Sequence, residues 1–221
     1  MLHTSIIYPS IAGVVGYAEK ASLNNLANSG AIKVALPKGA AAATNNYANT
    51  VVPYIAGVAG FLAGADGTVA ELTNNALISI NGWCGEGLSD ANNASQEESY
   101  SKDNVNYTDI DPCLAGVVAY LEAASARNLV NNGKVEYTSG ASRFHYVGGV
   151  VAMCGEKVQM SNFDNKGNIS LPTGVAIASL HCGGVIAHMR EGASLIDSNN
   201  NAGVEVKCST VAGSSHRFYR V

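Results

Sequence analysis

Apolar and polar residues along this chain follow one pattern that recurs five times. Its first part is a string of seven residues that reads apolar, small, Gly, Val, apolar, small, bulky. The copies occupy residues 11–17, 55–61, 114–120, 147–153 and 182–188. Gly and β-branched residues lower helix propensity, so each copy predicts a strand whose small residues let a neighbouring backbone come close.

A second string follows each copy at nearly fixed distance and ends in Asn-x-Gly or Asn-x-Ala. It occupies residues 25–30, 71–76, 128–133, 162–167 and 197–202, and its last residue lies 17, 19, 17, 18 and 18 positions after the central Gly of the first string. We interpret Asn-x-Gly as a turn, because Asn and Gly adopt positive φ at the least cost. A short alternating segment comes next in every copy, as in residues 31–34, and predicts a strand with an apolar inner face.

Five paired strings in register predict a repeat fold. The central Gly residues are 44, 59, 33 and 35 positions apart, which indicates a basic coil of 33–35 residues with two insertions. One insertion, 39–50, is rich in Ala, and the other, 85–111, is acidic and has no strand pattern. Helical features occur only at 116–129, and the other copies lack them, so we expect strand plus loop there.

A repeat that cannot bury its apolar face alone stacks on its neighbours. We therefore expect an all-β fold, a right-handed parallel β-solenoid of about five coils, forming a single repeat domain over residues 1–221. The predicted coils lie near 7–51, 52–110, 111–145, 146–180 and 181–213. Residues 1–10 and 214–221, the latter with Arg217 and Arg220 as charged gatekeepers, are expected to cover the two open ends.

Composition narrows the classes of partner. The 221 residues carry 13 Lys and Arg against 17 Asp and Glu, and this balance offers no basic surface for nucleic acid. The longest apolar run, 55–65, is too short to span a bilayer and is broken by Gly, so no transmembrane segment is expected. The first residues also lack the basic start and long apolar core of a signal peptide.

The five cysteines have no metal-like spacing and leave two interpretations open. They are either buried small hydrophobes or part of an oxidised protein with at least one disulfide. Cys84 and Cys113 flank the acidic insertion where the chain leaves and re-enters the stack, so we predict a disulfide between them. The pairing of Cys154, Cys182 and Cys208 stays open.

No catalytic, cofactor-binding or metal-binding residue is assigned. Five histidines, residues 3, 145, 181, 188 and 216, could suggest a metal site with Cys154 and Cys182. However, Cys182 and His188 occupy the first and the bulky positions of the repeat, which favours a structural role. We expect the bulky positions to stack as a ladder in core or corner packing: Tyr17, Phe61, Tyr120, Met153 and His188.

The paired strings resemble the GLUG-type repeat. The matching positions in the first copy are Gly13, Tyr17, Asn25, Asn28 and Gly30, and in the fourth copy Gly148, Gly149, Asn162, Asn165 and Gly167. Ala76 and Ala202 depart from the pattern, since Gly is expected there. The resemblance implies a β-solenoid segment of a large bacterial surface or secreted protein, adhesin-like or attached to a peptidase, with no catalytic residues to carry over.

The repeat pattern together with this resemblance leads us to expect a non-catalytic structural or adhesive repeat module of a bacterial cell-surface or secreted protein. It would be extracellular, as part of a larger secreted protein, without a cofactor. Its expected partners are host or matrix glycans or proteins, or neighbouring domains or subunits at the solenoid ends, and the 85–111 insertion is expected to face the partner. The alternatives are a carbohydrate-active β-helix enzyme, which needs clustered acidic or basic residues on one face, or a glycan-binding face.

Overall fold

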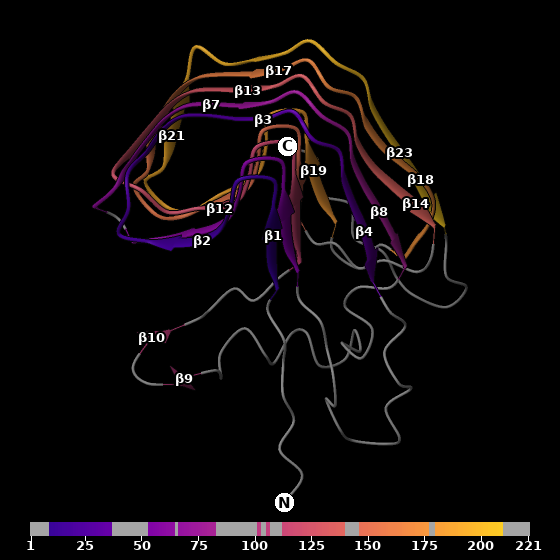
Figure 1. Cartoon of the computed structure of the whole chain (residues 1–221), viewed down its shortest axis with the longest axis horizontal. Coiled ribbons are helices and arrows are strands. Elements are labelled where there is room, and N and C mark those ends of the chain that lie inside the picture. Colours follow the sequence, from indigo (N-terminus) through magenta and orange to yellow (C-terminus); the bar gives the residue numbers. More distant parts are fainter. Residues whose placement is uncertain are drawn as a thin grey trace, which may run out of the picture.

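The computed structural model describes residues 9–36, 53–64, 66–82, 101–102, 105–106, 112–139, 146–176 and 180–209. These residues form strands, turns and bends, with no helix among them. Figure 1 shows the chain winding repeatedly along the same path, from the indigo coil at one end of the stack to the yellow coil at the other. The fold is a parallel β-solenoid, as the repeats predict.

Each of the five coils contributes one strand to each of four sheets, except that coil 5 contributes two to the third sheet. Coil 1 holds β1 (Ser10–Ala12), β2 (Val15–Glu19), β3 (Leu23–Asn28) and β4 (Ile32–Leu36). Coil 2 holds β5 (Tyr54–Ala56), β6 (Ala59–Ala63), β7 (Thr68–Asn74) and β8 (Ile78–Gly82). Coil 3 holds β11 (Cys113–Ala115), β12 (Val118–Leu121), β13 (Ser125–Asn131) and β14 (Val135–Ser139).

The last two coils follow the same plan. Coil 4 holds β15 (Tyr146–Gly148), β16 (Val151–Cys154), β17 (Gln159–Asn165) and β18 (Ile169–Ala176). Coil 5 holds β19 (His181–Gly183), β20 (Ile186–Met189), β21 (Ser194–Ile196), β22 (Asn199–Asn200) and β23 (Val204–Ser209). The short strands β9 (Ser101–Lys102) and β10 (Val105–Asn106) pair antiparallel within the acidic insertion, where the sequence has no strand pattern.

Equivalent strands lie side by side in chain order. Sheet 1 runs β1-β5-β11-β15-β19, and sheet 2 runs β2-β6-β12-β16-β20. Sheet 3 runs β3-β7-β13-β17-β21, with β22 also on β17, and sheet 4 runs β4-β8-β14-β18-β23. All of these pairings are parallel, so each residue of a coil lies next to its counterpart in the adjacent coil. The order is the one that the repeats predict.

The seven-residue string is divided between two sheets, and in this respect the prediction of one strand is wrong. Residues 13–14, and their counterparts in the other coils, form a bend between the strand of sheet 1 and that of sheet 2. Gly is needed at this corner because a Cβ there would overlap the backbone of the adjacent coil. The helix-like segment at 116–129 folds as β12, a short connection and the start of β13, so the prediction of strand plus loop is confirmed.

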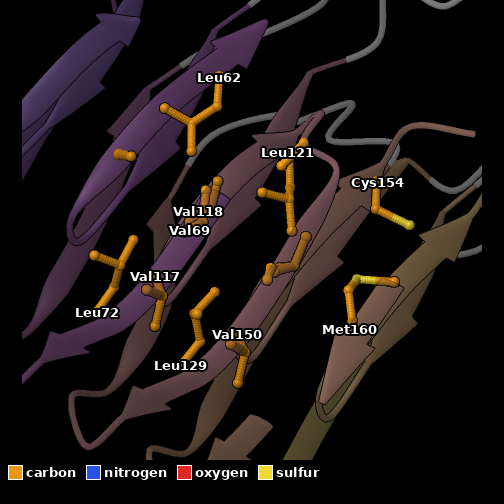
Figure 2. Packing of buried hydrophobic residues seen from close by; sticks show 14 of the residues in the cluster. Leu62, Val69, Leu72, Val117, Val118, Leu121, Leu129, Val150, Cys154 and Met160 are labelled. Atoms are coloured by element: carbon orange, nitrogen blue, oxygen red, sulfur yellow. The ribbon is translucent and has the colours of Figure 1, made fainter. Parts of the chain in front are cut away.

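Two apolar clusters fill the interior. One lies between sheets 2 and 3, where the side chains labelled in Figure 2 come from the facing strands and, for Val117 and Val150, from the bends that precede them. The other joins sheets 1 and 4 and contains Ile55, Ile78, Ile80, Leu114 and Tyr137. The predicted alternation is confirmed in sheet 4, because Ile78 and Ile80 are fully buried on either side of the outward Ser79. Coils 1 and 5 are half-buried to exposed, because each has one neighbouring coil within the described part of the chain.

The predicted covers of the two ends fall almost wholly outside the described residues. Residues 1–8 and 210–221 are among those that the structure does not describe, and so are the Ala-rich insertion and most of the acidic one. Capping by Arg217 and Arg220, and a partner-facing insertion, therefore stay predictions.

Candidate functional site

A column of asparagines runs through the solenoid from coil 1 to coil 5. It consists of Asn28, Asn74, Asn131, Asn165 and Asn200, the fourth residue of each polar string. In each step the side-chain Nδ2 donates a hydrogen bond to Oδ1 of the asparagine in the next coil, at 2.9, 2.9, 2.9 and 2.8 Å. We call this column the amide ladder. Its three middle members are fully buried.

The same amides also close the turn that follows them. Oδ1 of Asn131 accepts from the backbone N–H of Gly133 at 3.2 Å, and its Nδ2 donates to the carbonyl of Gly133 at 2.9 Å. Asn74 does the same with Ala76. The amides of Asn74 and Asn131 therefore use both their donors and their acceptor, which is what burial of a polar side chain requires.

The amide ladder explains why the two strings always occur together. A Cβ built on the central Gly of each copy would collide with the asparagine of the same coil, and with a backbone carbonyl of the next coil in the first four coils. The colliding pairs are Gly13 with Asn28, Gly57 with Asn74, Gly116 with Asn131, Gly149 with Asn165 and Gly184 with Asn200. The nearly constant spacing between the two strings is thus the length of chain that brings the asparagine amide of a coil into contact with the central glycine of the same coil.

The proposed reason for the Asn-x-Gly turn is wrong. Positive φ occurs three residues before the ladder asparagine, at Asn25, Glu71, Asn128, Asn162 and Asp197, with φ between 50° and 58°. None of the glycines that end the string has positive φ. Gly133 is required for space instead, because its Cβ would run into the carbonyl oxygen of Ala76 in the coil before.

The bulky positions form the predicted ladder. Tyr17, Phe61, Tyr120, Met153 and His188 are in register along sheet 2. The ring centroids of Phe61 lie 5.8 Å from those of Tyr17 and 4.5 Å from those of Tyr120, with nearly parallel planes. The ladder packs against a second row from sheet 1 in the outer corner between the two sheets. This is the corner packing that the sequence predicts.

The two described histidines belong to that corner. His181 and His188 place their ring centroids 5.4 and 4.9 Å from that of Tyr146. Within the described ranges, no three His, Cys, Asp or Glu side chains lie together in a way that could hold a metal ion. The histidines therefore stand in the structure as aromatic packing partners.

The cysteine side chains that the structure describes are buried or half-buried, and burial shifts the pKa of two of their thiols. Cys113, at the start of β11, and Cys154 are fully buried, and Cys182 is half-buried. Burial raises the pKa of the Cys182 thiol to about 11 and also raises the pKa of Cys154. A thiol with a raised pKa is a poor nucleophile at neutral pH. Cys84 lies outside the described residues, so the predicted Cys84–Cys113 disulfide stays a prediction.

The outer side of sheet 3 carries successive rows of polar side chains, which we call the polar face. Its rows follow the strand register and include Ser22, Thr68, Ser125, Gln159 and Ser194 in one, and Asn25, Glu71, Asn128, Asn162 and Asp197 in another. Hydrogen bonds join side chains between coils, as from Ser194 to Gln159 at 2.7 Å and from Asn162 to Asn128 at 3.2 Å. Successive members of a row are one strand spacing apart, about 4.8 Å.

The outer side of sheet 4 is more strongly charged. Its central row reads Lys33, Ser79, Glu136, Ser170 and Glu205. Lys134 forms an ion pair with Glu136, and this hydrogen bond lowers the pKa of the Glu136 carboxyl. Beside the pair lies a shallow depression lined by Lys134, Asn168, Ser170 and Glu205.

Neither the amide ladder nor the polar face was identified from the sequence. A signal for the ladder was present, because asparagine is the one residue common to all five polar strings. The polar face had no comparable signal, since its residue types vary from coil to coil and become one surface only when the coils stack.

In the described part of the chain no helix is long and apolar enough to cross a membrane. No protein-family model, curated protein or solved structure matches this chain.

Proposed function

We propose that this chain is a non-catalytic structural and adhesive repeat module of a bacterial cell-surface or secreted protein. The observation that carries the proposal is the amide ladder. The ladder shows that an asparagine and a central glycine recur in every coil because the stacking of the coils requires them. The residues that vary between coils are then the ones that face outward, as expected of a repeat scaffold that displays a surface.

The polar face supports an adhesive role. Amide and hydroxyl side chains both donate and accept hydrogen bonds, which suits a ligand covered in hydroxyl groups. Arg127 adds an exposed cation on β13, next to Ser161 of β17. The partner class that this surface fits is a polysaccharide laid across the strands. The resemblance of the paired strings to GLUG-type repeats supports an extracellular location as part of a larger secreted protein.

A glycan array probed with the purified chain tests this function. We expect retention of one class of polysaccharide, and about tenfold weaker binding by an Arg127→Ala, Gln159→Ala double variant, since each lost polar contact weakens binding by a few-fold. The matched control is Lys134→Ala, Glu136→Ala on sheet 4, which should bind like the wild type. Equal binding by both double variants, or no retained glycan, would contradict the adhesive role of the polar face.

The competing function is a carbohydrate-active enzyme. Incubation of the retained polysaccharide with the chain, followed by measurement of new reducing ends, separates the two. The proposed module binds without turnover. Cleavage that is lost on substitution of acidic residues would overturn the proposal.

A further inference from the structure

The two ends of the described solenoid present open strand edges. Among the strands that the structure describes, those of coil 1 pair only with coil 2, and those of coil 5 pair only with coil 4. Apolar positions that are fully buried in coils 2–4 are correspondingly half-buried at the ends, as for Ile11, Val15 and Leu195. An unpaired parallel edge over an apolar cross-section is a surface that another strand layer can extend.

We propose that the coil 5 end of one copy binds the coil 1 end of a second copy, head to tail, in the register of one further coil. Such a contact is heterologous, and repeated addition gives a linear assembly rather than a closed dimer. The inference is independent of the proposed adhesive function.

The amide ladder gives this contact a direction. In every step inside the chain, Nδ2 of one coil donates to Oδ1 of the next. At the coil 5 end the ladder therefore ends in a donor, Nδ2 of Asn200, which is exposed and, among the described residues, donates to the carbonyl of Ala202 in its own turn. At the coil 1 end it begins with an acceptor, Oδ1 of Asn28, so a head-to-tail joint continues the series. A head-to-head joint would place acceptor against acceptor.

Charge along the joint is complementary in the same register. Lys33 of coil 1 and Glu205 of coil 5 occupy the same row of sheet 4, so a second copy would place opposite charges one strand spacing apart. Within the chain each of them is next to a serine in that row, Ser79 and Ser170, and Glu205 also pairs with Lys207 of its own strand at 3.1 Å. A second pair of opposite charges lies in sheet 2. Ala18 of coil 1 and Met189 of coil 5 occupy the same row, and the residues that follow them are Glu19 and Arg190.

The apolar cross-sections also match. In the joint, Leu195 would lie on Leu23, Val204 on Ile32 and Ile186 on Val15, the kinds of pairs that already stack inside the chain. Coils 2, 3 and 4 stack although their connections between sheets 2 and 3 differ in length, so the similar difference between coils 5 and 1 is within what this fold accommodates.

Sedimentation velocity of the full chain over a range of concentrations tests the proposal. We expect the wild type to form species that lengthen with concentration. Lys33→Glu and Glu205→Lys should each weaken association about fivefold to tenfold, because a repulsion replaces an attraction. An equimolar mixture of the two variants should regain it, since each then offers the end that complements the other. The Lys33→Glu, Glu205→Lys double variant should also associate like the wild type.

Arg127→Glu in coil 3 is the matched control, because it changes the net charge by the same amount as Lys33→Glu but lies away from both ends. It should leave association unchanged, and far-ultraviolet circular dichroism should show the same fold in every variant. A wild type that stays monomeric throughout would overturn the proposal, as expected if residues such as 214–221 cover the end. Association that the single variants weaken no more than Arg127→Glu does, or that the mixture does not regain, would overturn it too.

Discussion

The amide ladder makes a quantitative prediction for the middle of the solenoid. Asn131 is fully buried and takes part in four hydrogen bonds: from Nδ2 of Asn74, to Oδ1 of Asn165, and with the N–H and the carbonyl of Gly133. Asn131→Ala removes all four. Oδ1 of Asn165 keeps the N–H of Gly167, whereas two buried donors, one N–H of Asn74 Nδ2 and the backbone N–H of Gly133, lose Oδ1 of Asn131 as their acceptor.

The magnitude follows from those contacts. Four buried hydrogen bonds at a net of about 1 kcal/mol each give a loss of about 4 kcal/mol, with a range of about 3–5 kcal/mol because two buried donors lose their acceptor while Oδ1 of Asn165 keeps one of its donors. Removal of an exposed polar side chain usually changes stability by less than about 0.5 kcal/mol. Asn132→Ala is therefore a matched control, since Asn132 is the next residue, is exposed and makes one side-chain bond, to Asn75.

Urea unfolding followed by far-ultraviolet circular dichroism measures both variants. We expect Asn131→Ala to lower the free energy of unfolding by about 4 kcal/mol with an unchanged dependence on urea concentration. Asn132→Ala should leave the midpoint almost unchanged. If the two variants differ by less than about 1 kcal/mol, the ladder does not stabilise the stack and the reasoning fails.

Three further predictions concern space, charge and covalent linkage. Gly133→Ala should be destabilised by more than about 2 kcal/mol in the same assay because its Cβ meets a backbone carbonyl, whereas Gly30→Ala, at the equivalent but open position of coil 1, should be near neutral. Because the pKa of Glu136 is lowered in the folded chain, this carboxylate contributes stability that is present above the ordinary pKa of a glutamate and is lost as pH falls through the lowered value. The urea midpoint of the wild type should therefore exceed that of Glu136→Gln by less as the solution is acidified. A difference that stays constant with pH would refute this prediction. Mass spectrometry of a non-reduced digest should find a linked Cys84–Cys113 peptide, and complete alkylation of both thiols without reduction would rule the disulfide out.

The sequence by itself determined the register of the solenoid. Equivalent residues of the five copies pair across adjacent coils, as in the row that begins with Ile32, Ile78 and Val135. The physical reason is that a parallel stack places buried apolar residues beside one another only when every coil repeats the same alternation of apolar and polar positions. Alternation and spacing are properties of the chain, so strand order and inward faces could be predicted without any coordinates.

Only the tertiary structure decided what the recurring polar residues do. Local propensity does not distinguish Asn25 from Asn28 as the residue that adopts a turn conformation, because both are asparagines in one polar string. In the folded chain Asn25 takes the positive φ and Asn28 turns inward, where its amide meets that of Asn74 one coil away. That choice depends on a hydrogen-bond partner 46 residues distant in the sequence, which no local pattern contains.

The same reason explains the functional surfaces. Tyr17 and Tyr120 occupy the same repeat position, yet Tyr17 is 57% exposed and Tyr120 is 8% exposed, because one lies in the end coil and the other has a coil on each side. The polar face and the complementary ends likewise arise from rows of residues contributed by different coils. A sequence specifies the members of such a row, but their common surface exists only once parallel stacking has set them one strand spacing apart.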